Sequence, residues 1–302
     1  MDALPVDTRS VDARSVDTGP VVVSVAACLR GDDGGSPTAV LVGDARLDDA
    51  ELARIPGRAG TSHLAVVAPR ASEHGAYAVR FFTATGELPG CGHGTVAAIA
   101  VLTLQAAGTV FHGLLRIAGR DVEATGTTGG VGVVEAWFDQ GVVEQRAVAR
   151  AERDAFLAAL GLEEDALHPE DDVFVASPGR ERLMIPVTDR AVLAGIRPDQ
   201  ERLAAVSRRH GQLGCFVYVP PSGAEPIAAA RMFAPAIGVP EDVANANSTG
   251  CLAAHLLRSG EDPTVAVDQG DALGRPSTVR ATATRTARGI LSHVGGTARV
   301  VS

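Results

Sequence analysis

The chain has 302 residues, of which 46% are hydrophobic and 21% are charged, a composition typical of a folded globular protein with room for one large or two medium domains. The formal net charge is -9 with acids and arginines scattered along the chain, so nucleic acid is not an expected partner. All 27 basic residues are arginine, and the lack of lysine excludes a pyridoxal-phosphate Schiff base and a Walker-type phosphate loop.

The N-terminal segment gives no signal for export. Its first ten residues, MDALPVDTRS, lack the apolar stretch of a signal peptide, and the four cysteines are widely spaced with no CxxC pair. The longest apolar runs are about half the length of a membrane-spanning helix. We therefore expect a cytoplasmic chain with reduced thiols and no membrane association. Residues 1–19 contain a short polar repeat, RSVDARSVDTG, and this composition predicts a flexible leader.

From Pro20 onward the pattern is dominated by short strands separated by Gly, Pro and Asp turns. In chain order, the predicted strands are VVVSVAACL, TAVLVGD, HLAVVAP, GAYAVRFFTA, LLRIAG, GGVGVVEAWF, VFVAS, RLMIPV and GCFVYVP. Helical spacing of Ala, Leu and charged residues predicts helices over 95–107, 152–160, 198–209 and 249–257. The chain is therefore predicted to be a mixed α and β protein.

Two of the predicted helices resemble each other. One follows Cys-Gly-His-Gly and the other follows Asn-Ser-Thr-Gly, and both continue as almost wholly apolar stretches, which must be enclosed. This repetition predicts two similar halves with a cleft between them, and the helix starts are expected to face that cleft. We place the N-terminal half at 20–128, with a terminal strand at 288–302 returning to it, and the C-terminal half at 129–287.

The segment FTATGELPGCGHGTVAAIAVL contains the first candidate site. Glycines at 90, 92 and 94 leave backbone N–H groups free at a helix start, where the dipole favours an anion. His93 can titrate near neutrality, and a helix start can activate the thiol of Cys91. Taken alone, the segment is more typical of a glycine-rich turn with a structural histidine and a core cysteine.

The segment RMFAPAIGVPEDVANANSTGCLAAHLL contains the second candidate site. Acidic residues in a Pro-Glu-Asp turn precede a group of amides and a hydroxyl at the start of the other apolar helix: Glu241, Asp242, Asn245, Asn247 and Ser248. A capped helix with surface acids in its lead-in is the alternative interpretation.

Four ordered segments together resemble the phenazine-biosynthesis (PhzF-like) family. GVPEDVANANSTGCLAAHL is similar to the family's G-I-x-E-D-P-x-T-G-S-A signature, and GELPGCGHGTVAA to its E-x-P-x-C-G-H-A-T-x-A-A segment. GGSPTAVLVGD and DQGDALGRPS are similar to G-G-N-P-x-A-V and E-Q-G-x-x-x-G-R-P-S. Their order and spacing over residues 20–302 make the resemblance specific.

The resemblance implies an α+β fold like that of diaminopimelate epimerase, with two pseudo-symmetric halves, each a sheet wrapped around a central helix. It also implies an isomerase of specialised or antibiotic metabolism that needs no cofactor and no metal and shifts a double bond by moving a proton in a small unsaturated acid. A phenazine precursor-like or an alkylated pyrroline carboxylate-like acid would suit this reaction. The matching catalytic positions are His93 and Asp242. The family often pairs, so a homodimer is also expected.

The chain departs from the family at its main catalytic glutamate. The family's S-E-T-x-F segment aligns best with Thr61-Ser62-His63-Leu64-Ala65-Val66, which places His63 where the glutamate is expected. A histidine can exchange a proton near neutral pH, so we predict His63 as the principal acid/base. A half-buried strand histidine without a role is the alternative. In the second signature, Asn245-Ala246-Asn247 replaces T-G-S.

We expect the substrate to be held by side chains and amides of both segments: Cys91, Gly92, Gly94, Asn245, Asn247 and Ser248. Two other functions stay open. One is a one-cysteine epimerase or racemase using Cys91, since a facing second cysteine is missing and Asn245 stands in its place. The other is a carboxylate-binding protein without catalysis. The remaining histidines show no metal-ligand spacing, and a metal is not predicted.

Overall fold

The computed structural model describes residues 21–43, 47–70, 75–106, 108–223, 227–260 and 263–301, so the predicted leader 1–19 lies outside the described residues. The strands of the first half of the chain are β1 (Val21–Ala27), β2 (Ser36–Val42), β3 (His63–Pro69), β4 (Ala76–Thr83), β5 (Gly86–Leu88), β6 (Val110–Ile117), β7 (Arg120–Gly130) and β8 (Val133–Val142). Those of the second half are β9 (Glu144–Ala147), β10 (Phe174–Ser177), β11 (Arg182–Pro186), β12 (Cys215–Val219), β13 (Ala228–Ala234), β14 (Val239–Asp242), β15 (Val265–Gln269), β16 (Ser277–Thr286) and β17 (Gly289–Val300).

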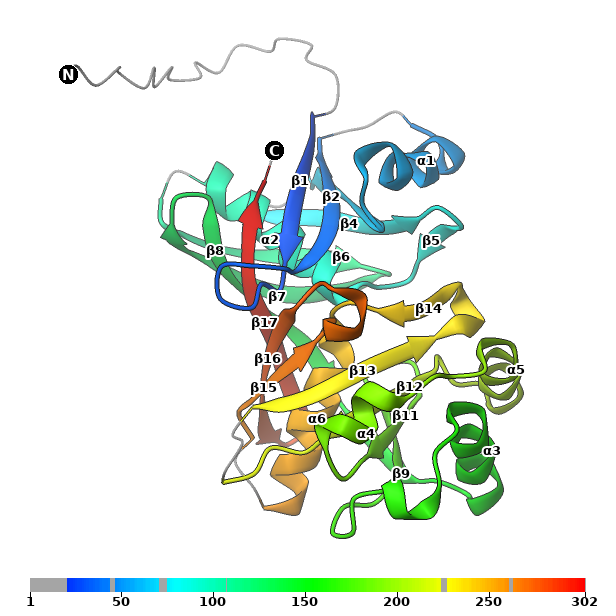
Figure 1. Cartoon of the computed structure of the whole chain (residues 1–302). Helices are drawn as coiled ribbons and strands as arrows, with labels where there is room; N and C mark the ends of the chain where they lie inside the picture. The colour runs from blue at the N-terminus through cyan, green and yellow to red at the C-terminus, as the bar shows by residue number, and fades with distance from the viewer. Residues whose placement is uncertain are drawn as a thin grey trace, which may run out of the picture.

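The helices are fewer, and only two of them lie inside the molecule. The α-helices are α1 (Asp49–Ala59), α2 (Gly92–Gln105), α3 (Arg150–Leu160), α4 (Arg190–Gly195), α5 (Gln200–His210) and α6 (Ala246–Ser259), and the short 3-10 turns are η1 (Glu164–Ala166), η2 (Pro235–Ile237) and η3 (Asp271–Leu273). Figure 1 shows α2 and α6 surrounded by strands in the upper and lower halves of the molecule, whereas α1, α3 and α5 lie at its outer edge.

Strand pairing in the upper half closes a ring around α2. The ring runs β1-β2-β3-β4-β6-β7-β8-β17 and returns to β1. Closure leaves this part of the sheet without open edges, and its interior must be filled. The strand β17, close to the C-terminus, thus completes a ring that the N-terminal strands begin.

The lower half is a second curved sheet around α6, with pairing order β17-β16-β15-β13-β12-β11-β10-β9. Strand β9 follows β8 almost directly along the chain, so β8 and β17 are common to both halves. The two halves are therefore parts of one 17-stranded sheet among the described residues.

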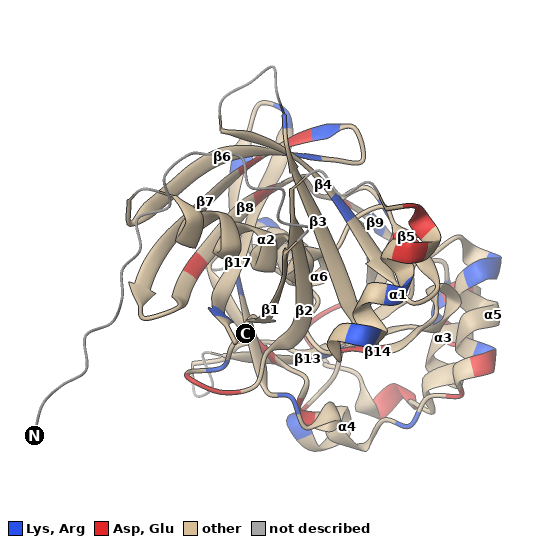
Figure 2. Ribbon diagram, turned by 90° about the horizontal axis from the view of Figure 1, so that it is seen from above, with Lys and Arg blue, Asp and Glu red and all other residues tan. Residues whose placement is uncertain are grey.

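Helix α2 can occupy the inside of a ring because many of its residues are small and it contains no Lys, Arg, Asp or Glu. Its sequence GHGTVAAIAVLTLQ is buried from Gly92 through Thr103, and Gly94 and Gly126 lie where a Cβ would meet Phe81 and Thr103. In the ribbon of Figure 2, the positions of Arg, Asp and Glu lie mainly on the outer helices and near strand ends, and α2 has none of these residues. No helix in the described part of the chain is long and apolar enough to cross a membrane.

The prediction of a mixed α and β protein is confirmed, but several elements differ. Helix α1 was not predicted, because Pro56 and Gly57 interrupt its pattern, yet Asp48 and Glu51 form a capping box and Pro56 falls in the last turn. Strand β13 reads AAARMFA, with Ala favouring helix, but it is paired and buried at all seven positions. Both central helices begin three residues before the predicted start.

Candidate active site

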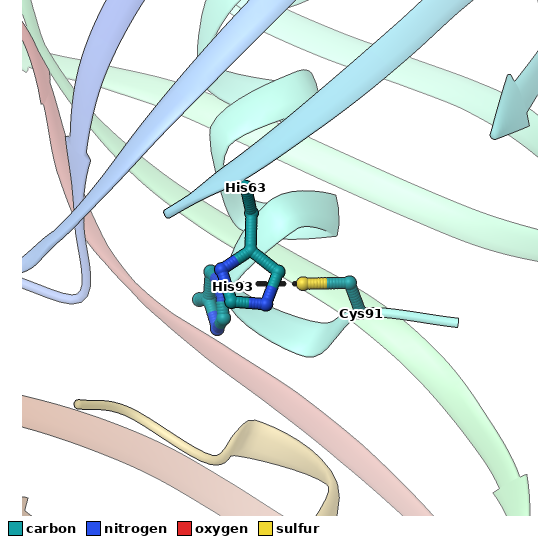
Figure 3. A group of neighbouring side chains, drawn as sticks. All are labelled: His63, Cys91 and His93. Carbon is teal, nitrogen blue, oxygen red and sulfur yellow. Dashed lines mark hydrogen bonds between the residues drawn. The ribbon is translucent and has the colours of Figure 1, made fainter. Parts of the chain in front are cut away.

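His63 is the first residue of β3 and pairs with Thr38 of β2 at the end of the ring where α2 begins. Its side chain is buried, with 6% of the residue exposed, and its Nδ1 lies 2.8 Å from the Ser62 hydroxyl. The Ser62 contact leaves Nε2 available for other chemistry. The ring of His63 meets the ring of His93 edge-on, with centroids 4.4 Å apart (Figure 3).

Cys91 and His93 lie at the start of α2, with Cys91 just before the first turn and His93 within it. Cys91 is the N-cap, and its sulfur accepts a hydrogen bond from the backbone N–H of Gly94 at 3.4 Å, as a capping hydroxyl would. The same sulfur lies 3.3 Å from Nε2 of His93. Nδ1 of His93 contacts the carbonyl oxygen of Ala244 at 3.1 Å, so this histidine joins the starts of the two central helices.

The lower half contributes Asp242, the last residue of β14, and Asn245, the N-cap of α6. Asp242 Oδ1 is 3.8 Å from His93 Nδ1, and its Oδ2 accepts a hydrogen bond from the Asn245 amide at 2.9 Å. Asn245 in turn caps α6 by accepting from the N–H of Ser248. Asp242 and Asn245 therefore form a hydrogen-bonded pair at the start of α6, and the carboxylate of this pair faces the imidazole of His93.

Burial and neighbouring charges shift the two histidines in opposite directions. Burial, followed by the charge of His93, lowers the pKa of His63, and Asp242 only partly opposes this. Burial also disfavours the charged form of His93, but Cys91, Asp242 and the Ala244 carbonyl outweigh it and raise its pKa. The arrangement favours a protonated His93 beside a neutral His63, which is a donor next to an acceptor.

These groups line a cavity of about 370 Å³ between the two halves. Among the predicted site residues, those on its wall are His63, Cys91, Gly92, His93, Asp242, Asn245 and Asn247. Gly94 and Ser248 are not on the wall: the N–H of Gly94 is taken by Cys91, and Ser248 is buried with its hydroxyl on the sulfur of Met232. A cavity of this size fits a small organic molecule.

The cavity wall also carries residues that the sequence interpretation missed. Arg120, Arg180 and Arg182 line the cavity. Arg182 is only 2% exposed; its Nη2 donates to the carbonyl of Arg180, while Nε and Nη1 are buried and have no hydrogen-bond partner among the described residues. A buried guanidinium with free donors is costly unless an anion binds it. No motif marked Arg182, since nothing in a strand sequence distinguishes a buried arginine from an exposed one.

Two glutamines hold the start of α6 in place. Gln269 accepts from the N–H of Asn245 at 2.8 Å and donates to the hydroxyl of Thr249 at 3.1 Å. Gln140 of β8 donates to the carbonyl of Asn247 at 3.0 Å. Gln269 belongs to the DQGDALGRPS segment, so that motif supplies a support for the candidate site.

Comparison with known proteins identifies the family of the chain. Residues 31–302 match the family described as phenazine biosynthesis-like protein, PhzC-PhzF. The chain belongs to this family. It is 34% identical over 209 residues to an uncharacterised isomerase of Deinococcus radiodurans, with 67% of each chain covered. It is also 31% identical to the trans-2,3-dihydro-3-hydroxyanthranilate isomerase of Pseudomonas fluorescens, covering 80% of this chain and 83% of the relative.

Solved structures show the same fold. A phenazine biosynthesis protein of the PhzF family from Bacillus anthracis superimposes with a TM-score of 0.79 at 19% identity, covering 94% of this chain and 98% of that one. A probable proline racemase from Agrobacterium radiobacter gives 0.57 at 10% identity, covering 93% and 91%. The predicted diaminopimelate epimerase-like α+β fold is thus confirmed, and the PhzC-PhzF protein described here is an isomerase.

Proposed function

We propose that this isomerase moves a proton between two carbon atoms of a small unsaturated amino or carboxylic acid, without a cofactor, and that His63 carries the proton. One observation carries the proposal: a buried imidazole, held at Nδ1 by Ser62, lies on the cavity wall in contact with His93. A general base must lie within reach of the proton that it takes, and a cavity wall provides that position.

The chemistry needs only transfers within the site. Nε2 of His63 takes a proton from a substrate carbon, the C–H electron pair moves into the conjugated system, and the proton returns to another carbon as the double bond shifts. The protonated imidazole of His93 lies beside His63 and stabilises the negative charge that develops on the substrate, while the carboxylate of Asp242 favours the protonated form of His93. Asn245 and Asn247 border the same space and can bind polar groups of the substrate.

The arginines on the cavity wall favour a carboxylate on the substrate. Arg120, Arg180 and Arg182 all line the cavity and add positive charge to it. The Pseudomonas relative is named for an acid with an amino group and a partly unsaturated ring. A cyclic unsaturated acid of this class, from specialised metabolism, is the substrate that we propose here.

The test is deuterium incorporation from heavy water into a panel of cyclic unsaturated amino and carboxylic acids, run in the presence of a chelator. His63→Ala should lower exchange by about 10²- to 10⁴-fold, the usual contribution of a general base. His63→Glu should retain much more exchange than His63→Ala, because it restores a proton-carrying group. His112→Ala, which removes an exposed histidine of β6, is the control for loss of an imidazole. Equal exchange in His63→Ala and the parent would reject His63 as the proton carrier.

A one-cysteine epimerase is the second candidate, because the Cys91 sulfur lies 3.3 Å from His93 Nε2 at the start of a helix. Such an enzyme would exchange a substrate α-proton, and Cys91→Ser would then abolish exchange as completely as His63→Ala or more so. A proton shift through His63 predicts a much smaller loss in Cys91→Ser.

A further inference from the structure

The side chains of His63, Cys91 and His93 converge from two elements. One ring nitrogen of each histidine and the Cys91 sulfur all lie within 4.8 Å of one another, and all three residues are buried (Figure 3). In a tetrahedral zinc site, bond lengths of about 2.0–2.3 Å place ligand atoms about 3.3–3.7 Å apart. The pair of Cys91 Sγ and His93 Nε2 is already separated by 3.3 Å. Small side-chain rotations would close the two remaining distances, both to a ring nitrogen of His63.

We propose that these three residues form a binding site for Zn²⁺, with the fourth coordination position open to the cavity. Thiolate and imidazole are the ligands that zinc prefers, and three protein ligands with one open position describe the zinc sites that bind exchangeable molecules. All three residues line the cavity, which gives the ion a path to the site. This proposal goes beyond the proton-shift function and does not depend on it.

The outer contacts of the two histidines fit metal binding. Zinc-binding histidines donate their second ring N–H to an oxygen acceptor, which fixes the ring and its tautomer. Here Nδ1 of His63 lies 2.8 Å from the Ser62 hydroxyl, and Nδ1 of His93 lies 3.1 Å from the Ala244 carbonyl with Asp242 at 3.8 Å. Both Nε2 atoms are thereby left for the ion.

The sequence predicts no metal, because its histidines and cysteines lack short, regular ligand spacing. The fold instead brings His63 of β3 to a Cys-x-His pair at the start of α2. His63, which stands where the family has its glutamate, is the residue that completes the cluster. Zinc and the proposed proton transfer need the same lone pair of His63, so zinc should inhibit proton exchange, and a chelator should reverse the inhibition.

The experiment uses the full chain, stripped with a chelator and dialysed. Zn²⁺ is titrated against a chromophoric competitor, and Co²⁺ is added in parallel to record its electronic spectrum. We expect one Zn²⁺ per chain, a rise in the melting temperature, and with Co²⁺ a thiolate charge-transfer band together with intense tetrahedral bands. Cys91→Ser should remove the charge-transfer band, and His63→Ala should weaken Zn²⁺ binding at least tenfold.

Cys215→Ala is the matched control, because Cys215 is also a buried thiol but belongs to the apolar cluster of the lower half. It should keep both the stoichiometry and the spectrum. Absence of stoichiometric binding, or binding that survives Cys91→Ser and His63→Ala unchanged, would overturn the proposal. Exchange assays on the stripped protein report on proton transfer separately, so either proposal can fail while the other stands.

Discussion

Arg182 is the residue whose environment is hardest to explain without a ligand. It is almost fully buried in β11, and two of its three guanidinium nitrogens have no hydrogen-bond partner in the part of the chain that the structure describes. Desolvation lowers the pKa of its guanidinium, and the charge of Cys251 only partly offsets this. A substrate carboxylate would supply the missing acceptors. Arg182 is therefore proposed as a substrate-binding residue. Its burial lowers the stability of the fold, and the binding of a substrate carboxylate would explain why the residue is present.

Arg182→Met tests this interpretation, because the two side chains have similar length but only arginine is charged. Loss of a charge-assisted hydrogen bond of about 1.5–3 kcal/mol should raise KM by roughly 10- to 100-fold for the substrate found in the exchange panel, with a smaller change in kcat. The free energy of unfolding in urea should stay equal or increase, since an unpaired buried charge is removed.

The exposed Arg58 provides the control: Arg58→Met should change neither KM nor stability. A large loss of stability in Arg182→Met with an unchanged KM would show that the arginine serves the fold and not the substrate.

At the scale of single residues, sequence reasoning located the two segments that meet at the cavity but not their partners. The family signature carries Asp242, and His63 could be found only by aligning a segment in which the expected glutamate is absent. Gln140 and Gln269 act through contacts with residues distant in the chain. Such contacts depend on the three-dimensional pairing of strands, which local patterns do not specify.

The starts of α2 and α6 touch at Gly92. A Cβ on Gly92 would lie 2.6 Å from the Cβ of Ala246 and 3.4 Å from the backbone nitrogen of Asn247. The glycine is needed for a close approach of two helices, and this approach sets the distance between His93 and Asp242.

Gly92→Ala should therefore separate the two helix starts. We expect a loss of about 1–3 kcal/mol in the free energy of unfolding, typical of overpacking, and a fall in proton exchange as His93 moves away from Asp242. Urea denaturation followed by fluorescence measures the first effect, and the heavy-water assay measures the second.

Gly90→Ala is the control for stability, because nothing lies within 4 Å of a Cβ at that position. If Gly92→Ala were as stable as Gly90→Ala, the two helix starts would have room to move apart, and the close approach would not constrain the site.

At the scale of elements, strands with strong Val, Ile and aromatic content were predicted, and strands dominated by small or polar residues were missed. Strand β16 (STVRATATRT) alternates buried and exposed positions, but its inward residues are largely Val and Ala, which give a weak apolar signal. The space inside the sheet explains this choice, since α6 packs closely against β16 and β17. The predicted domain boundaries stay a prediction, because β8 and β17 are common to both halves.

At the scale of the whole molecule, the lower half is tied together by Asp171. Its carboxylate accepts from the Tyr218 hydroxyl of β12 at 2.6 Å and lies 2.8 Å from His255 Nε2 of α6. The central helix is thus connected to the surrounding sheet by one partly buried acid. Burial alone would raise the pKa of Asp171, but the hydrogen bonds from His255 and Tyr218 outweigh it and lower the pKa.

This shift makes the stability of the molecule depend on pH in a defined direction. A carboxyl whose pKa is lower in the folded than in the unfolded state, where it is about 3.9, stabilises the fold fully above that value. As the pH falls below about 4, the unfolded chain takes up the proton first, and the contribution is lost. Asp171→Asn should therefore cost about 1–3 kcal/mol near neutral pH, and this deficit relative to the parent should shrink in acid.

Urea denaturation of the parent and of Asp171→Asn, from about pH 7 down to about pH 3, measures the deficit at each pH. The neighbouring exposed residue provides the comparison, and Asp172→Asn should follow the parent at every pH. A deficit in Asp171→Asn that stayed constant into acid would mean that the side chain matters for its shape and not for its charge. In that case the contact between α6 and β12 would depend on the packing of the Asp171 side chain, because the charge of the parent carboxylate, which is lost in acid, would make no contribution.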